Sequence, residues 1–314
     1  VSYAATSEGV SGVDRCVVRD LTLRNGWQGV LIEGSLGSVV EGCRIQTTDH
    51  GIWLGMGSDR ATLRFNEISQ DPYAGASPHM KGWWDNWLAH KVGGFYDRIG
   101  IEIRKTIGGH EVHDHLIHDH WDGIEDGGGV GENVGLRVHH NRVFRVADDG
   151  LEPNGAEEDA RWNNNHIEET CCAFRIKTVR IGPLYAYCNL FIDNGEDYRC
   201  FVPHYPGKVY VYQNTSTSAS SLTYNKVQGI GTPHYFVHNN LFWCERWWSG
   251  GDLKPNWHGD HNVFIRRGTR KEWGQTRDLA KELGIDQKSL WLEAADPGFI
   301  DFKGKDLRLK DVAR

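Results

Sequence analysis

The stretch "ARWNNNHIE", from Ala160 to Glu168, decides the fold because its pattern returns along the chain at a nearly constant interval. Residues that alternate in polarity surround one Asn, and this alternation with a period of two is typical of strands and not of helices. From Asn141 onward the steps between such positions are 24, 24, 25, 26 and 22 residues, and His115 takes the same place 26 residues before Asn141. The Asn position recurs at Asn66, Asn141, Asn165, Asn189, Asn214, Asn240 and Asn262.

This repeat predicts an all-β solenoid. Strand-rich repeats of this period, without helical segments, are typical of chains in which each coil adds short parallel strands to its neighbours. At the usual inter-strand spacing of about 4.8 Å, about ten coils would make a rod about 50 Å long. We expect the recurring Asn to lie at a turn, where it tolerates left-handed backbone and its amide can hydrogen-bond from coil to coil.

A second strand follows each Asn position by about eight residues and opens on Gly or Ala. These strands read "GVLIE", "GIWLG", "GIEIR", "GIEDG", "GLEPN" and "AFRIK". The residue after the Gly or Ala is apolar and faces the core, so alternation turns the next one outward. The outward residues form one column: Leu31, Trp53, Glu102, Glu125, Glu152 and Arg175.

Three glutamates and an arginine on successive coils would lie about 5 Å from neighbour to neighbour. Like charges this close repel and raise one another's pKa, which indicates a functional column. An ordinary solvated sheet face is the alternative. More polar residues flank the column, since Asp122 and Asp149 precede the Gly of two strands and Arg104, Asn154 and Lys177 lie two residues further out.

With its Asn-centred coils and "GI" strands, the chain resembles the right-handed parallel β-helix proteins of the pectate-lyase-like superfamily over most of residues 10 to 265. The resemblance implies a parallel β-helix over residues 1–265 and a capping segment over 266–314. In that segment "DPGFIDFKGKDLRL" looks like the tail of many secreted carbohydrate-active β-helix proteins. The stretch before it, "TRDLAKELG", predicts a short helix from Thr276 to a Gly284 cap. A secreted or periplasmic location also follows from the resemblance.

The largest departure from the repeat is an insertion over residues 70–98. As the resemblance implies, substrate lies in a groove between the outward column and the turn that carries this insertion. Arg104 and Asn154 would contact the substrate there, and aromatic rings can stack on sugars. A loop that packs its own aromatic residues as a small core is the alternative. The expected sugar-binding wall consists of Trp53, Trp83, Trp84, Trp87 and Trp121.

The histidines of "HEVHDHLIHDHWDG" are scattered over a strand, a turn and the next strand, which argues against a zinc or copper centre. His120, beside Asp122 at the mouth of the expected groove, is the candidate proton carrier. A net charge of −7 without a basic run argues against nucleic acid and anionic membrane as partners. We therefore expect a polysaccharide or oligosaccharide partner, as the resemblance implies.

The favoured function is glycoside hydrolysis, which needs one carboxylic acid and one carboxylate and no cofactor. Glu125 with Asp122 would form the acid side. Glu152 with Asp149 would form the base or nucleophile side, with Arg175 keeping Glu152 ionised. Carboxylates outnumber cations in the column, which favours this chemistry. The "DD" and "RIK" elements resemble those of polygalacturonases, but the Gly-His-Gly element of that family is absent, so no specificity for galacturonan follows.

A polysaccharide lyase acting on a uronic-acid polymer is the alternative. As the resemblance to pectate and chondroitin lyases suggests, Glu102, Glu125 and Glu152 would hold Ca²⁺, with Lys177 or Arg175 as the base. A non-catalytic glycan-binding or adhesin β-helix is the third interpretation. The clustered acids argue against it, since sugar binding alone rarely requires them.

Overall fold

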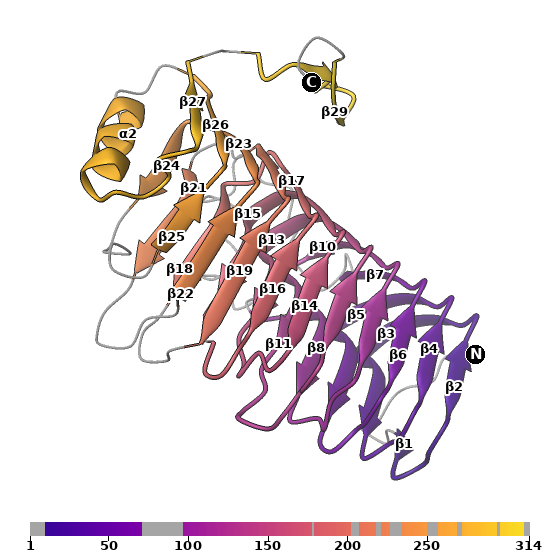
Figure 1. Cartoon of the computed structure of the whole chain (residues 1–314). Helices are drawn as coiled ribbons and strands as arrows, with labels where there is room; N and C mark the ends of the chain where they lie inside the picture. The colour runs from indigo at the N-terminus through magenta and orange to yellow at the C-terminus, as the bar shows by residue number, and fades with distance from the viewer. Residues whose placement is uncertain are drawn as a thin grey trace.

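Parallel strand pairs connect successive coils in the computed structural model, so the fold is a parallel β-helix, as the repeat and the resemblance predicted. The coils stack along one axis from the N-terminal end to the end that carries helix α2 (Figure 1). The structure describes residues 10–70, 97–177, 179–201, 207–217, 221–226, 234–249, 257–268, 272–293 and 296–310.

One face is a ten-stranded parallel sheet to which successive coils contribute one short strand each (Figure 1), in agreement with the expected ten coils. Buried and partly exposed residues alternate along these strands because every second side chain points into the coil. The strands are β2 (Val17–Arg19), β4 (Val39–Glu41), β6 (Thr62–Arg64), β9 (Glu111–His113), β12 (Arg137–His139), β14 (Ala160–Asn163), β16 (Leu184–Tyr187), β19 (Lys208–Tyr212), β22 (His234–His238) and β25 (Trp257–Asp260).

The remaining parallel strands form one seventeen-stranded sheet. Some coils cross it in a single long strand, while others divide into two shorter ones. The long strands are β3 (Thr22–Glu33), β5 (Arg44–Gly55), β13 (Arg142–Pro153) and β15 (His166–Ile176). The short strands are β1 (Val10–Ser11), β7 (Glu67–Gln70), β8 (Ile99–Arg104), β10 (Leu116–His120), β11 (Asp122–Asp126), β17 (Leu190–Ile192), β18 (Glu196–Phe201), β20 (Thr215–Thr217), β21 (Ser221–Lys226), β23 (Leu241–Cys244), β24 (Arg246–Ser249), β26 (Val263–Arg266) and β27 (Leu290–Leu292).

The recurring Asn side chains form a hydrogen-bonded ladder, which confirms the predicted contact from coil to coil. Nδ2 of Asn165 donates to Oδ1 of Asn189 at 3.1 Å, and Nδ2 of Asn189 donates to Oδ1 of Asn214 at 3.0 Å. The same Oδ1 of Asn189 accepts the backbone N–H of Asn165 at 3.0 Å. At His115 the ring takes over this role, since its Nδ1 accepts the backbone N–H of Asn66 at 3.2 Å. The ladder therefore satisfies buried backbone donors at one turn of each coil.

The left-handed residue of each turn is not the ladder Asn, and that part of the prediction was wrong. Positive φ values occur one position earlier, as at Asn164 with 53° and Cys188 with 55°. Both of these residues are exposed, whereas the ladder residues Asn165 and Asn189 are buried. The chain turns its corner on the exposed residue because the buried amide must stay in line with its neighbours.

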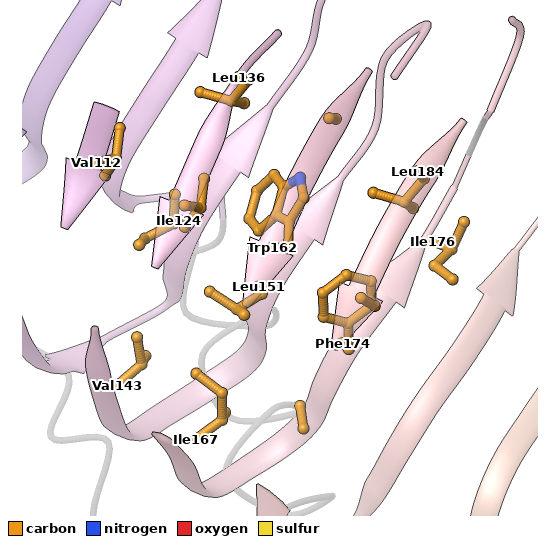
Figure 2. Packing of buried hydrophobic residues seen from close by; sticks show 14 of the residues in the cluster. Val112, Ile124, Leu136, Val143, Leu151, Trp162, Ile167, Phe174, Ile176 and Leu184 are labelled. Atoms are coloured by element: carbon orange, nitrogen blue, oxygen red, sulfur yellow. The ribbon is translucent and has the colours of Figure 1, made fainter. Parts of the chain in front are cut away.

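Inward side chains fill the interior of the coils (Figure 2). Ile124, Leu151 and Phe174 are the apolar residues that follow the opening Gly or Ala, and all three are fully buried. Register pairs Ile124 with Leu151 and Leu151 with Phe174. From the opposite sheet, Trp162 packs edge-on against Phe174 with ring centroids 5.9 Å apart. The apolar half of the alternation is thus confirmed.

The segment after β26 contains one more strand of the solenoid, a helix and an antiparallel strand pair. Strand β27 adds one more parallel pair to β26. Helix α2 (Glu272–Glu282) begins four residues before the expected start at Thr276. Strands β28 (Phe299–Asp301) and β29 (Asp306–Leu309) form an antiparallel pair. Among the residues that the structure describes, no helix has the length and apolar character that a membrane span requires.

Candidate active site

Strand register pairs the three glutamates of the column directly with one another. Glu102 on β8 lies opposite Glu125 on β11, and Glu125 lies opposite Glu152 on β13. A side chain at Gly123 would overlap the carbonyl oxygen of Gly150 on the next coil. Glycine opens these strands because the backbones approach so closely there. The column that alternation predicted is therefore present on consecutive coils.

The carboxylates of the column are buried, which rules out an ordinary solvated sheet face. The exposed fraction is 2% for Glu102, 5% for Glu125 and 2% for Glu152. Asp122 and Asp149, which precede the glycines, are 3% and 0% exposed. Cationic side chains from the outer positions contact the three glutamates of the column.

Arg104 links the first two glutamates of the column. Its Nε contacts Glu102, and its Nη2 lies 3.0 Å from Oε1 of Glu125. Nδ2 of Asn154 donates to the same oxygen at 3.2 Å. Gly127 leaves room for this guanidinium, because a Cβ there would lie 3.1 Å from Nε of Arg104. Both residues that were expected to contact substrate thus also contact the column itself.

Lys177 and Arg175 each neutralise a different carboxylate. Nζ of Lys177 contacts Glu152, whereas Nη1 of Arg175 contacts Asp149 and lies 3.7 Å from Oδ2 of Asp148. Lys177 is therefore a direct partner of Glu152, which the sequence analysis did not assign. Lys177 reaches that glutamate from the outer position, and the guanidinium lies instead on the two aspartates that precede the glycine.

Burial raises the pKa of three carboxyl groups in the column. The pKa of Asp122 is raised well above its usual value by burial and then by the charge of Glu152. Burial and the charge of Asp149 raise the pKa of Glu152 more than Lys177 lowers it. The pKa of Glu125 is also raised, mainly by burial. The charge of Arg175 also lowers the pKa of Glu152, as the sequence analysis expected, but the net shift is upward.

Asp122 lies at the centre of the acidic residues. One of its oxygens lies within 4.8 Å of an oxygen from Glu125 and one from Glu152, and the same holds for Asp148 with Asp149. The backbone N–H of Asp149 donates to Oδ1 of Asp122 at 2.9 Å. Carboxyl groups this close cannot all be ionised without a large electrostatic cost, so the cluster favours proton sharing.

Three of the acids come close enough to act as metal ligands, but two of them also contact cationic side chains. Glu125 and Glu152 come together with Asp122, whereas Glu102, the third ligand expected from the sequence, is held by other partners. Carboxylate oxygens suit Ca²⁺ chemically. However, Arg104 already contacts Glu125 and Lys177 already contacts Glu152, so these two carboxylates have cationic partners within the protein.

The sequence-based search missed His50 and Asp49. Nδ1 of His50 lies 2.5 Å from Oδ2 of Asp49, and its Nε2 lies 2.5 Å from Oε2 of Glu102. His50 directly precedes Gly51, just as Asp122 and Asp149 directly precede the opening glycine of their strands on later coils. That shared position was the signal that could have identified it.

Arg199 extends the site by one coil and was also missed. Register pairs it with Arg175. Its Nε lies 2.8 Å from Oε2 of Glu196, and its Nη1 lies 3.6 Å from Oδ1 of Asp148. The residue two before it, Asp197, stands where earlier coils have Gly or Ala, so the strand pattern did not point to Arg199.

His120 and Trp121 are buried and do not line the mouth of a groove. His120 is fully buried, and its Nδ1 lies 3.0 Å from the carbonyl oxygen of Arg98. Burial lowers the pKa of His120 to about 4, so the ring is neutral at neutral pH and is a poor proton carrier there. Trp121 is only 2% exposed and offers no face for stacking a sugar. Both residues lie at the bend where β10 meets β11, which turns them inward.

Trp53 is the one expected wall residue that lies in the column, opposite Glu102. It is partly buried, and the ring of His50 contacts it edge-on at a centroid distance of 5.2 Å. Most of the insertion, including Trp83, Trp84 and Trp87, lies outside the described residues.

Comparison with known proteins gives a likeness in structure only. No family model matches the chain, and neither does any curated protein. One solved chain, described as "The complex structure of XylC with xylose", matches with a TM-score of 0.43 and 13% sequence identity. The match covers 90% of this chain and 53% of that one, so the chain spans about half the length of its solved neighbour. Function is therefore inferred from the site.

Proposed function

We propose that the chain is a glycoside hydrolase that cleaves a polysaccharide or oligosaccharide with the carboxylates around Gly123 and Gly150. The observation that carries this proposal is the convergence of Asp122, Glu125 and Glu152 to within 4.8 Å, out of contact with bulk water. Glycosidic cleavage near neutral pH requires a protonated acid beside an ionised carboxylate. Crowding and burial supply the first, and an ion pair supplies the second.

The acid side consists of Asp122, Glu125 and Glu152, whose pKa values are all raised. Asp149 takes the nucleophile or base side because it forms the ion pair with Arg175. The sequence analysis placed Glu152 on the base or nucleophile side, whereas this proposal places it on the acid side. The protonated members can donate to the leaving oxygen, and the ionised one can attack the anomeric carbon or activate water.

Ion pairing also favours the hydrolase over the lyase. A lyase must neutralise the carboxylate of a uronate with Ca²⁺ or with cationic side chains and must remove the proton alpha to it. Arg104, Arg175 and Lys177 each contact a carboxylate of the chain itself. Arg104, which also contacts Glu102, and Arg175, which contacts Asp149, therefore already have carboxylate partners outside the acid side.

The test is a screen of neutral and uronic polysaccharides, with reducing ends and ultraviolet absorbance measured in parallel, with and without EDTA. New reducing ends without absorbance, unchanged by EDTA, are the expected result. An absorbing unsaturated product would establish the lyase, and binding without any product would establish the non-catalytic alternative. Asp149→Asn should abolish turnover, while Glu111→Gln, on β9 of the ten-stranded sheet, should leave it unchanged.

A further inference from the structure

A continuous chain of ion pairs runs from β5 to β11. Both ring nitrogens of His50 are engaged, one by Asp49 and the other by Glu102, each at 2.5 Å. The second oxygen of Glu102 contacts Nε of Arg104, and Nη2 of that arginine reaches Oε1 of Glu125 at 3.0 Å. Negative and positive groups alternate along the chain, so each contact supports the next.

We propose that His50 is a positioning residue for the hydrolase, which fixes Glu102 against Arg104 and so holds the guanidinium on Glu125. This inference rests on the proposed function. It assigns His50 the role of ordering the acid side of the site from two coils away, without contact with the substrate.

Arg104 needs this support because much of its side chain is exposed to solvent. The Arg104 side chain is 44% exposed, so its guanidinium has room to leave Glu125. Fixing a free arginine side chain costs rotamer entropy. Glu102 is only 2% exposed and can act as a rigid anchor if both of its oxygens are held. His50 supplies the second of those contacts.

The surroundings of His50 keep its ring charged. Burial lowers its pKa, but the hydrogen bonds to Asp49 and Glu102 outweigh burial and raise the pKa to about 9. The edge of Trp53 packs against the ring, and the neutral His120 lies near enough to be affected by its charge. Among the described residues, Arg98 is a further cation near this end of the ion-pair chain, and its charge interacts with Asp49.

The kinetic test is His50→Asn, with His118→Asn as the matched control. His118 also has a carboxylate neighbour, at 2.6 Å from Asp119, but it lies outside the column. With Arg104 released, Glu125 loses a group that lowers its pKa. The alkaline limb of the kcat/KM profile should therefore move to higher pH, and kcat should fall on the order of tenfold. His118→Asn should change neither. An unchanged limb and kcat in His50→Asn would overturn the proposal.

A structural readout keeps the proposal testable without activity. Nitrogen NMR should show a doubly protonated His50 ring at pH 7 and an Arg104 Nε–H signal that broadens in His50→Asn. Glu102→Gln should have the same effect, and the double variant should add little to either change. If His50→Asn does not fold, Asp49→Asn replaces it, and the His50 pKa should fall. A wild-type protein that cleaves no glycan would refute the proposed function, whereas a neutral ring or an undisturbed Arg104 signal would refute the role of His50.

Discussion

The backbone N–H of Asp149 donates a 2.9 Å hydrogen bond to Oδ1 of Asp122, and this bond ties the two coils that carry the acidic cluster together. One carboxyl group thus has two roles. Its Oδ1 satisfies a buried backbone donor, and the group as a whole lies within reach of four other acids. The two roles can be separated by substitution.

Asp122→Asn keeps an oxygen for the Asp149 N–H but removes the acidic proton, whereas Asp122→Ala removes both. Each variant should lower kcat at least about a hundredfold, the usual scale for loss of a general acid. Only Asp122→Ala should also lose about 1 to 3 kcal/mol of unfolding free energy, because it leaves the buried N–H without a partner. Urea unfolding and steady-state kinetics check this. Equal stability of the two variants, both with normal turnover, would contradict the assignment.

Glu125→Gln and Glu152→Gln test the rest of the acid side. Both glutamines match the glutamates in shape but cannot donate a carboxylic proton, so each should lower kcat at least about a hundredfold. Each variant relieves repulsion within the cluster but also removes the carboxylate partner of Arg104 or Lys177, so the two effects on stability oppose each other. Glu111→Gln is the control for expression and folding. Wild-type turnover in both variants would place the acid elsewhere.

The ion pair of Arg175 with Asp149 predicts a strong asymmetry in stability. Arg175→Met leaves a fully buried carboxylate without its cation and should cost about 3 to 5 kcal/mol of unfolding free energy. Adding Asp149→Asn should restore much of that loss, because no unpaired charge then remains. Chemical unfolding of the single and double variants measures the difference. An additive double variant would show that the two side chains do not depend on each other.

Much of this architecture could be predicted from the sequence, because stacking repeats the same local chemistry on every coil. The spacing of the Asn residues and the alternation around Gly123 and Gly150 placed the ladder, the core and the glutamate column. That pattern does not show which carboxylate each long cationic side chain contacts. Lys177 and Arg175 lie two residues apart on one strand end, and only their three-dimensional paths decide which of them meets Glu152.

For His50 and His120 the physical cause of the error is the bend before the second strand. Alternation fails at a bend, so it could not show that His120 turns inward while His50 reaches across to Glu102. The insertion enters at the same bend, between β7 and β8. Sequence patterns therefore predict the straight parts of each coil better than its corners.

The Asn ladder predicts a position-specific loss of stability. Asn189→Ala removes the amide that donates to Asn214 and accepts from Asn165, and it leaves the backbone N–H of Asn165 without a partner. We expect a loss of about 2 to 4 kcal/mol, as for several buried hydrogen bonds broken at once. Asn163→Ala, on a partly exposed position of β14, should change the unfolding free energy by less than about 1 kcal/mol. Similar losses in both variants would show that the ladder contributes nothing special.

His115 is the histidine of the ladder, and it should make the fold sensitive to acid. Burial lowers the pKa of His115 to about 3, well below the value of 6.5 for an unperturbed imidazole. The unfolded chain therefore binds a proton on His115 near pH 6.5, whereas the folded chain binds it only at much lower pH. The resulting stability is fully present above about pH 6.5 and is lost as the pH falls toward 3, at a rate of up to about 1.4 kcal/mol for each pH unit.

His115→Asn should remove this sensitivity while keeping the ladder. An amide at this position can accept the N–H of Asn66 and can donate toward Asn141, as the other ladder residues do. At pH 8 the variant should be within about 1 kcal/mol of wild type, and below pH 6 it should become progressively more stable than wild type. Urea unfolding from pH 8 to pH 4 measures both slopes, with His140→Asn on an exposed turn as the control. Removing a histidine that titrates must change the slope of unfolding free energy against pH. Equal slopes for wild type and His115→Asn would therefore show that acid acts on another buried group.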